Sequence, residues 1–120
     1  MSEPLVADDG ADEVLDALRD VGQAALATRE ATHEIERRAD HLASVRRSGR
    51  RWGEVVSSER RPRLTELLSN ALRVLSDNGV RFRRALARAM HSEGMSTEDI
   101  ARHFGVSRQR ISNLLRRRTA

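Results

Sequence analysis

The stretch that decides the fold is Thr97–Arg116, which reads TEDIARHFGVSRQRISNLLR. Its apolar residues recur at the three- and four-residue spacing of a helix on both sides of a central glycine. Ala101 is small enough to let two helices cross closely, and Gly105 can adopt the positive φ that a short turn needs. We expect the shared core to consist of Ile100, Phe104, Val106, Ile111 and Leu114. The segment therefore predicts two helices that cross at a tight turn.

The second of these helices carries polar side chains suited to a nucleic acid. Ser107 is a good N-cap, so we expect the helix to begin at Arg108. Four of its residue types can bond base edges or phosphates in a major groove, and all four are expected to point outward: Arg108, Gln109, Ser112 and Asn113.

From Ile100 to Ala120 the chain has six arginines and no acidic residue. Such a cationic face attracts phosphates without regard to sequence and makes binding depend on salt. We therefore expect phosphate contacts from Arg102, Ser107, Arg110, Arg116, Arg117 and Arg118. The alternative is a three-helix unit that has turned to protein contacts, and the charge argues against it.

The segment resembles the helix-turn-helix of bacterial transcription regulators, and within them the promoter-reading region of sigma factors. The resemblance rests on Ile100-Ala101, on Phe104-Gly105-Val106 and on the run from Ser107 to Ile111. It implies that Ser107 caps the recognition helix and that Arg108 and Gln109 touch bases or phosphates. It covers about the last third of the chain, and the rest does not resemble the polymerase-binding regions of a sigma factor.

The composition favours an all-α protein. Two phenylalanines, one tryptophan and no tyrosine leave a core of Leu, Val, Ile and Ala, which suits closely packed helices. All 22 basic residues are arginine, as expected of a GC-rich, for example actinobacterial, genome. Residues 1–45 hold eleven acidic side chains against four arginines, whereas residues 46–120 hold eighteen arginines against seven acids. This polarity separates a half that repels nucleic acid from a half that attracts it.

Signals for other classes of protein are missing from the sequence. There is no cysteine, no apolar run of membrane-spanning length and no secretory signal, so we expect a cytoplasmic, nucleoid-associated protein without membrane contact. We find no phosphate loop, nucleophile motif or histidine pair at metal-site spacing. We therefore expect a non-enzyme with no catalytic residues, no cofactor and no metal.

Residues 11–47 predict one long helix with a seven-residue repeat. One column of the repeat is Val14, Val21, Thr28, Ile35 and Leu42, and its companion four residues later is Leu18, Ala25, Thr32 and Ala39. This spacing is typical of a coiled coil. We favour pairing with an antiparallel helix or self-association; the alternative is a long amphipathic helix folded back on the C-terminal region.

Two further predictions concern the middle of the chain. Trp52 lies in an arginine-rich hinge, where it either stacks on a base or a guanidinium group or, as we prefer, is a buried anchor between helices. Beyond the hinge, Pro62 suits the first turn of a helix that stops at Asn78-Gly79, and a separate helix spans residues 80–93. Ser96 is expected to cap the helix that follows.

Together these observations predict a long N-terminal coiled-coil-type helix followed by a helical domain that ends in a tri-helical helix-turn-helix. The expected parts are a flexible arm (1–10), a helix for dimerisation or partner binding (11–48), a basic hinge (49–61) and a DNA-binding domain (62–120). We expect a dimeric transcriptional regulator that reads the major groove of double-stranded DNA with residues 107–117. The alternatives are an adapter that binds a helical protein partner, such as a sigma factor, polymerase or sensor protein, through residues 11–47, and a non-specific nucleoid-associated protein.

Overall fold

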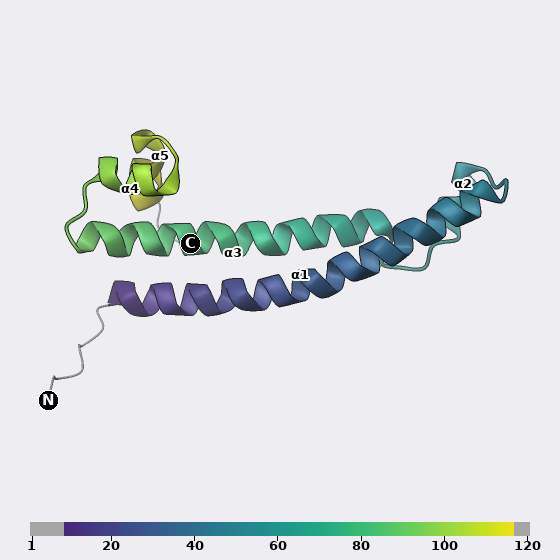
Figure 1. Cartoon of the computed structure of the whole chain (residues 1–120), viewed down its shortest axis with the longest axis horizontal. Coiled ribbons are helices and arrows are strands. Elements are labelled where there is room, and N and C mark those ends of the chain that lie inside the picture. Colours follow the sequence, from purple (N-terminus) through teal and green to yellow (C-terminus); the bar gives the residue numbers. More distant parts are fainter. Residues whose placement is uncertain (1–8, 117–120) are drawn as a thin grey trace, which may run out of the picture. The chain divides into compact units, whose positions relative to one another are not determined.

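The computed structural model describes residues 9–116, which form five helices and no strand (Figure 1). In chain order these are α1 (Asp9–Arg47), α2 (Trp52–Ser57), α3 (Leu64–Ser92), α4 (Thr97–Phe104) and α5 (Arg108–Arg116). The predicted all-α fold is confirmed. The expected arm of residues 1–10 lies outside the described residues up to residue 8, and α1 already begins at Asp9.

The chain divides into two compact units. Unit 1 combines residues 1–21 with residues 78–120, and unit 2 consists of residues 22–77. Helices α1 and α3 each run through both units, so the unit that holds the helix-turn-helix is built from two separate pieces of chain.

One column of the predicted heptad repeat in α1 is half-buried as expected. The other column was predicted one residue too far along the chain. Val14, Val21, Thr28, Ile35 and Leu42 are half-buried as expected. The companion column in the structure lies three residues later, where Ala17, Ala24 and Arg38 are buried. The predicted companions Leu18, Ala25, Thr32 and Ala39 are all exposed, so that part of the prediction is wrong.

Within unit 1, the first part of α1 pairs with α3 in antiparallel orientation. Asp20 forms an ion pair with Arg81, and Glu13 lies 3.4 Å from Arg88 between Oε1 and Nη1. From one pair to the other, the residue number in α1 rises by seven while the residue number in α3 falls by seven, so the two helices are antiparallel. This part of α1 is thus folded back on the C-terminal region of its own chain.

Helix α3 is continuous, so the predicted stop at Asn78-Gly79 is wrong. Twenty-nine residues from Leu64 to Ser92 form one helix. A Cβ atom at position 79 would lie 3.3 Å from Nη1 of Arg83, one turn further along the helix. The glycine therefore makes room for an arginine head group instead of ending the helix.

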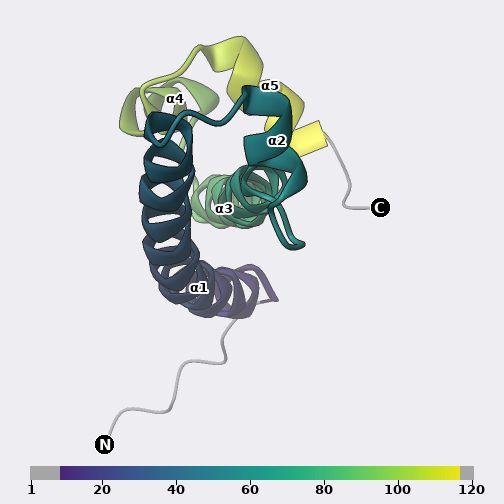
Figure 2. The same ribbon diagram turned by 90° about the vertical axis from the view of Figure 1, so that its right-hand side faces the viewer.

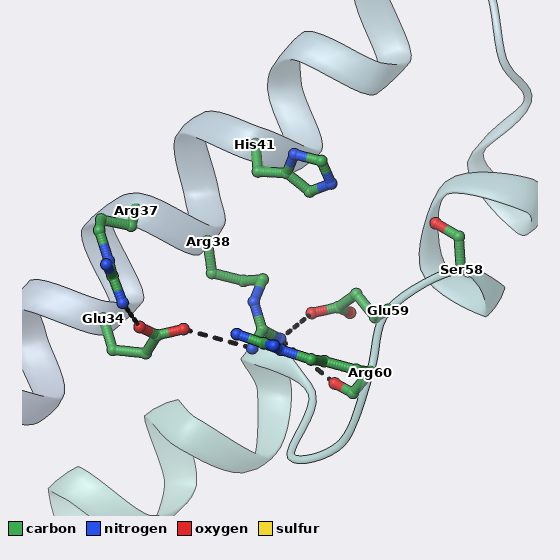
Figure 3. Close-up of a pocket in the computed structure, with 7 residues that line it drawn as sticks. All are labelled: Glu34, Arg37, Arg38, His41, Ser58, Glu59 and Arg60. Atoms are coloured by element: carbon green, nitrogen blue, oxygen red, sulfur yellow. Dashed lines mark hydrogen bonds and ion pairs between the residues drawn. The ribbon is translucent and has the colours of Figure 1, made fainter.

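Unit 2 is organised around a buried arginine in α1. Arg38 is only 8% exposed, and its guanidinium donates to Glu59 and to the backbone carbonyls of Arg60 and Pro62, as well as to Glu34 (Figure 3). Glu59 also accepts a hydrogen bond from the backbone N–H of Leu64 at the start of α3. One side chain thus ties α1 to the segment between α2 and α3.

Trp52 is not the buried anchor that we preferred from the sequence. Its side chain is 56% exposed, and the guanidinium carbon of Arg46 lies 5.1 Å from the centre of its ring. Val55, three residues later, is completely buried instead. Of the two interpretations, stacking with a guanidinium group is the one that the structure supports.

Candidate nucleic-acid interface

The C-terminal helices α4 and α5 pack against each other (Figure 2). Their contact is built on a small apolar core. Three of its buried residues, Ile100, Ala101 and Ile111, were predicted, and the fourth, Ala87 of α3, was not. The core is completed by partly buried Met90, Met95, Phe104, Val106, Leu114 and Leu115. The predicted arrangement of two helices on a third is therefore confirmed.

The turn between α4 and α5 depends on the backbone of Gly105. Its φ of 67° lies in the left-handed region, which residues with a Cβ atom adopt at a cost. In that conformation the N–H of Val106 reaches the carbonyl of Ala101 at 3.1 Å, which satisfies a group left free at the end of α4. The predicted role of this glycine is confirmed.

Both helices are capped by the predicted serines. Oγ of Ser96 accepts from the N–H of Asp99, and Oγ of Ser107 accepts from the N–H of Arg110, each at 3.1 Å. Helix α5 begins at Arg108, as expected from the position of its cap. The caps fix where α5 starts and therefore which side chains its first turn exposes.

Three of the four expected base-contacting side chains are exposed on α5, namely Arg108, Gln109 and Asn113, whereas Ser112 is half-buried. Nε2 of Gln109 donates to Oδ1 of Asn113 at 3.3 Å, so the two amides lie side by side on one face. That face is opposite to buried Ile111, which anchors α5 in the core. The helix presents polar groups to solvent without using them in its own packing.

The expected phosphate-contacting residues differ in their present partners. Arg102 forms an ion pair with Asp99, and Arg116 donates to Asn113. Arg110 is exposed, and in the described part of the chain its side chain has no hydrogen bond or ion pair. Arg117 and Arg118 lie outside the described residues.

Two arginines of α3 join this surface, although the sequence did not predict them there. Arg83 and Arg84 line a cavity of about 310 Å³ together with Arg110 and Asn113 of α5. Their distance in sequence from α5 hid this grouping. The only signal in the sequence is the four-residue spacing of Val80 and Arg84, which places these two residues on one face of α3.

Comparison with known proteins identifies the same region. Residues 79–119 match the Homeodomain-like domain family, and this match comprises the end of α3, α4 and α5. The region is a helix-turn-helix module of the DNA-binding type. No curated protein and no solved structure is significantly similar to the chain.

No helix among the described residues combines the length and apolarity needed to cross a membrane. Histidine and acidic side chains between residues 9 and 116 do not gather in any group of three or more suited to a metal ion.

Proposed function

We propose that the protein is a DNA-binding transcriptional regulator that inserts α5 into the major groove. The observation that carries this proposal is the exposed polar face of α5, where Arg108, Gln109 and Asn113 face solvent on a helix fixed by a buried Ile111. Arginine bonds guanine and glutamine or asparagine bonds adenine in the major groove. Ser112, which is half-buried, serves as a peripheral contact in this arrangement.

Phosphate contacts complete the proposed interface. Arg102 belongs to α4, Ser107 immediately precedes α5, and Arg110 and Arg116 lie along α5. Arg117 and Arg118 extend the positive charge beyond the described residues. These side chains would supply the salt-dependent part of the affinity, whereas the exposed face of α5 selects the sequence.

The proposal is tested by selection of the purified protein on fragmented genomic DNA at near-physiological salt. The wild type should enrich one motif, and a variant with Arg108→Ala and Gln109→Ala should lose it. The control carries Arg29→Ala and Gln23→Ala, which remove the same residue types from exposed positions on α1. Equal recovery of all fragments by the wild type would instead indicate a non-specific nucleoid-associated protein, and no recovery at low salt would favour the adapter.

We further propose that the protein acts as a homodimer in the cytoplasm. Leu68, Leu72 and Leu75 recur at helical spacing on α3 within unit 2 and are 44%, 69% and 42% exposed. Exposed apolar stripes of this kind are unusual on monomers and support an interface. Sedimentation analysis should give a dimer for the wild type and a monomer for Leu72→Glu, and a two-fold symmetric dimer should protect two half-sites about 10 bp or a multiple apart.

A further inference from the structure

The cavity between α3 and α5 within unit 1 has an unusual charge composition. It is lined by Arg83, Arg84 and Arg110, by the amide of Asn113, and by the apolar side chains of Val80 and Leu114. Among the residues that the structure describes, no carboxylate lines it. Three like charges around one space repel each other, and an anion in that space would relieve the repulsion.

Donor groups of these arginines also lack hydrogen-bond partners in the described part of the chain. Nε of Arg84 is buried and has no hydrogen-bond partner. Within residues 9–116, the guanidinium groups of Arg83 and Arg110 likewise form no hydrogen bond or ion pair. Arg83 and Arg110 are exposed, whereas Nε of Arg84 is buried, and burying a charged donor without an acceptor is unfavourable. A buried donor of this kind in native proteins usually meets an ion or a water molecule.

Another cavity, in unit 2, provides a comparison, because there arginines form ion pairs with carboxylates. It is lined by Arg37, Arg38 and Arg60 but also by Glu34 and Glu59. Dashed lines in Figure 3 join Arg37 and Arg38 to these carboxylates. Arg37 and Arg38 are therefore paired with carboxylates of the same cavity. The described lining of the cavity between α3 and α5, by contrast, includes three arginines and no carboxylate.

We propose that the α3–α5 cavity is a binding site for a phosphate group. Guanidinium groups present paired N–H donors that match the oxygens of a phosphate, and Asn113 adds an amide donor because its Oδ1 already accepts from Gln109. The volume of about 310 Å³ is large enough to admit a phosphate group. The phosphate is supplied either by the DNA backbone or by a small phosphorylated molecule.

Occupation of the site would tie α3 to the recognition helix. Arg83 and Arg84 belong to α3, whereas Arg110 and Asn113 belong to α5. A phosphate held by both sets bridges the two helices and fixes the direction of α5. Gly79 contributes space, because a side chain there would meet the guanidinium of Arg83.

The first experiment does not depend on DNA binding and uses inorganic phosphate. Thermal unfolding of the full chain is followed in increasing phosphate and in chloride of equal ionic strength. The wild type should gain more stability in phosphate than Arg84→Gln, whose response gives the general effect of this salt. Arg73→Gln, which removes an exposed arginine of unit 2 and leaves the cavity intact, should respond like the wild type. Arg84→Gln should weaken phosphate binding about tenfold or more, and Arg83→Gln, at an exposed position, gives a second variant should Arg84→Gln unfold.

The second experiment rests on the proposed function and identifies the source of the phosphate. Single phosphates of the selected DNA site are replaced by neutral methylphosphonates. If the DNA backbone fills the cavity, one replacement weakens the wild type about tenfold but has no effect on Arg84→Gln or Arg83→Gln. If only free phosphate distinguishes the variants, the ligand is a small phosphorylated molecule. Equal responses of wild type, Arg84→Gln and Arg83→Gln to both free phosphate and methylphosphonates would overturn the proposal.

Discussion

Nη1 of Arg38 and Oε2 of Glu59 lie 2.9 Å apart in a buried ion pair, although 21 residues separate them in the sequence. Their side chains are only 9% and 5% exposed. Because the same carboxylate oxygen accepts from the N–H of Leu64, the pair also fixes the start of α3. Unit 2 thus depends on a polar contact between segments that have few large apolar side chains.

Arg38→Met should destabilise the protein by about 3–5 kcal/mol, because it leaves Glu59 buried without its partner. The neighbouring Arg37→Met is the matched control: Arg37 pairs with Glu34 but is 65% exposed, so its loss should cost less than about 1 kcal/mol. Urea denaturation measures both. Similar values for the two variants would contradict the structural role of the buried pair.

The stability of unit 2 should fall in acid. Burial raises the pKa of Glu59, but hydrogen bonds from Leu64 and Arg38 and the charges of Arg38 and Arg63 outweigh it, so the pKa is lowered from 4.5. A carboxylate with a lowered pKa in the folded state stabilises the protein fully above its unfolded pKa, and this contribution is lost as the pH falls through the folded value. Unfolding free energy should therefore decline below about pH 4.5.

Glu59→Gln tests the source of this acid sensitivity, since glutamine keeps an acceptor for Leu64 but cannot titrate. The variant should be less stable than the wild type at pH 7, and its stability should fall less steeply between pH 4.5 and pH 3. Glu34, whose pKa is lowered chiefly by a hydrogen bond from Arg37, should account for part of the remaining slope. A slope unchanged by Glu59→Gln would assign the effect to other carboxylates.

Two glycine substitutions should change stability in opposite directions. Gly105→Ala should destabilise the protein by about 1–2 kcal/mol, because alanine is strained at a φ of 67°. Gly22→Ala lies inside α1, has no neighbour within 4 Å of an added Cβ, and should stabilise by about 0.5–1 kcal/mol. Thermal unfolding of both variants checks the signs. Stabilisation by Gly105→Ala would mean that the turn is not left-handed.

Ser107→Asp should separate the two roles proposed for this residue. Aspartate is as good an N-cap as serine, so stability should stay within about 0.5 kcal/mol, whereas Ser107→Ala should lose about 1 kcal/mol. The added negative charge should nevertheless weaken DNA binding if Ser107 contacts a phosphate. Ser96→Asp, which makes the same exchange at the cap of α4, should leave DNA binding unchanged. Equal DNA affinity of Ser107→Asp and wild type would remove Ser107 from the interface.

The helix-turn-helix could be predicted because its signals are local. Ile100, Gly105 and Ile111 occupy positions whose size or backbone freedom only a few residue types supply, and the caps at Ser96 and Ser107 lie next to the helices they start. Which face of α1 is buried could not be predicted equally well. Both candidate columns contain alanines, and because Ala24 and Ala25 are the same residue type, their apolar character does not show that Ala24 is the buried one.

Errors elsewhere have physical reasons of the same kind. Asn-Gly commonly ends helices, but the glycine within α3 instead accommodates Arg83. A single tryptophan provides no periodicity, so its exposure could not be inferred, and Val55 takes the buried position. Arg38 was not singled out because arginine is rarely buried, and its partners lie on segments distant in sequence.

The discontinuous make-up of unit 1 gives the chain the topology of an inserted domain. Residues 22–77 leave unit 1 along α1 and return to it along α3, and the pairs Glu13–Arg88 and Asp20–Arg81 hold the two connecting helices antiparallel at that point. A short loop that joins residue 21 directly to residue 78 would therefore convert unit 1 into one continuous domain, which consists of the first part of α1, the end of α3, α4 and α5. A fragment limited to residues 79–119 would lack the first part of α1, and with it the carboxylates that neutralise Arg81 and Arg88.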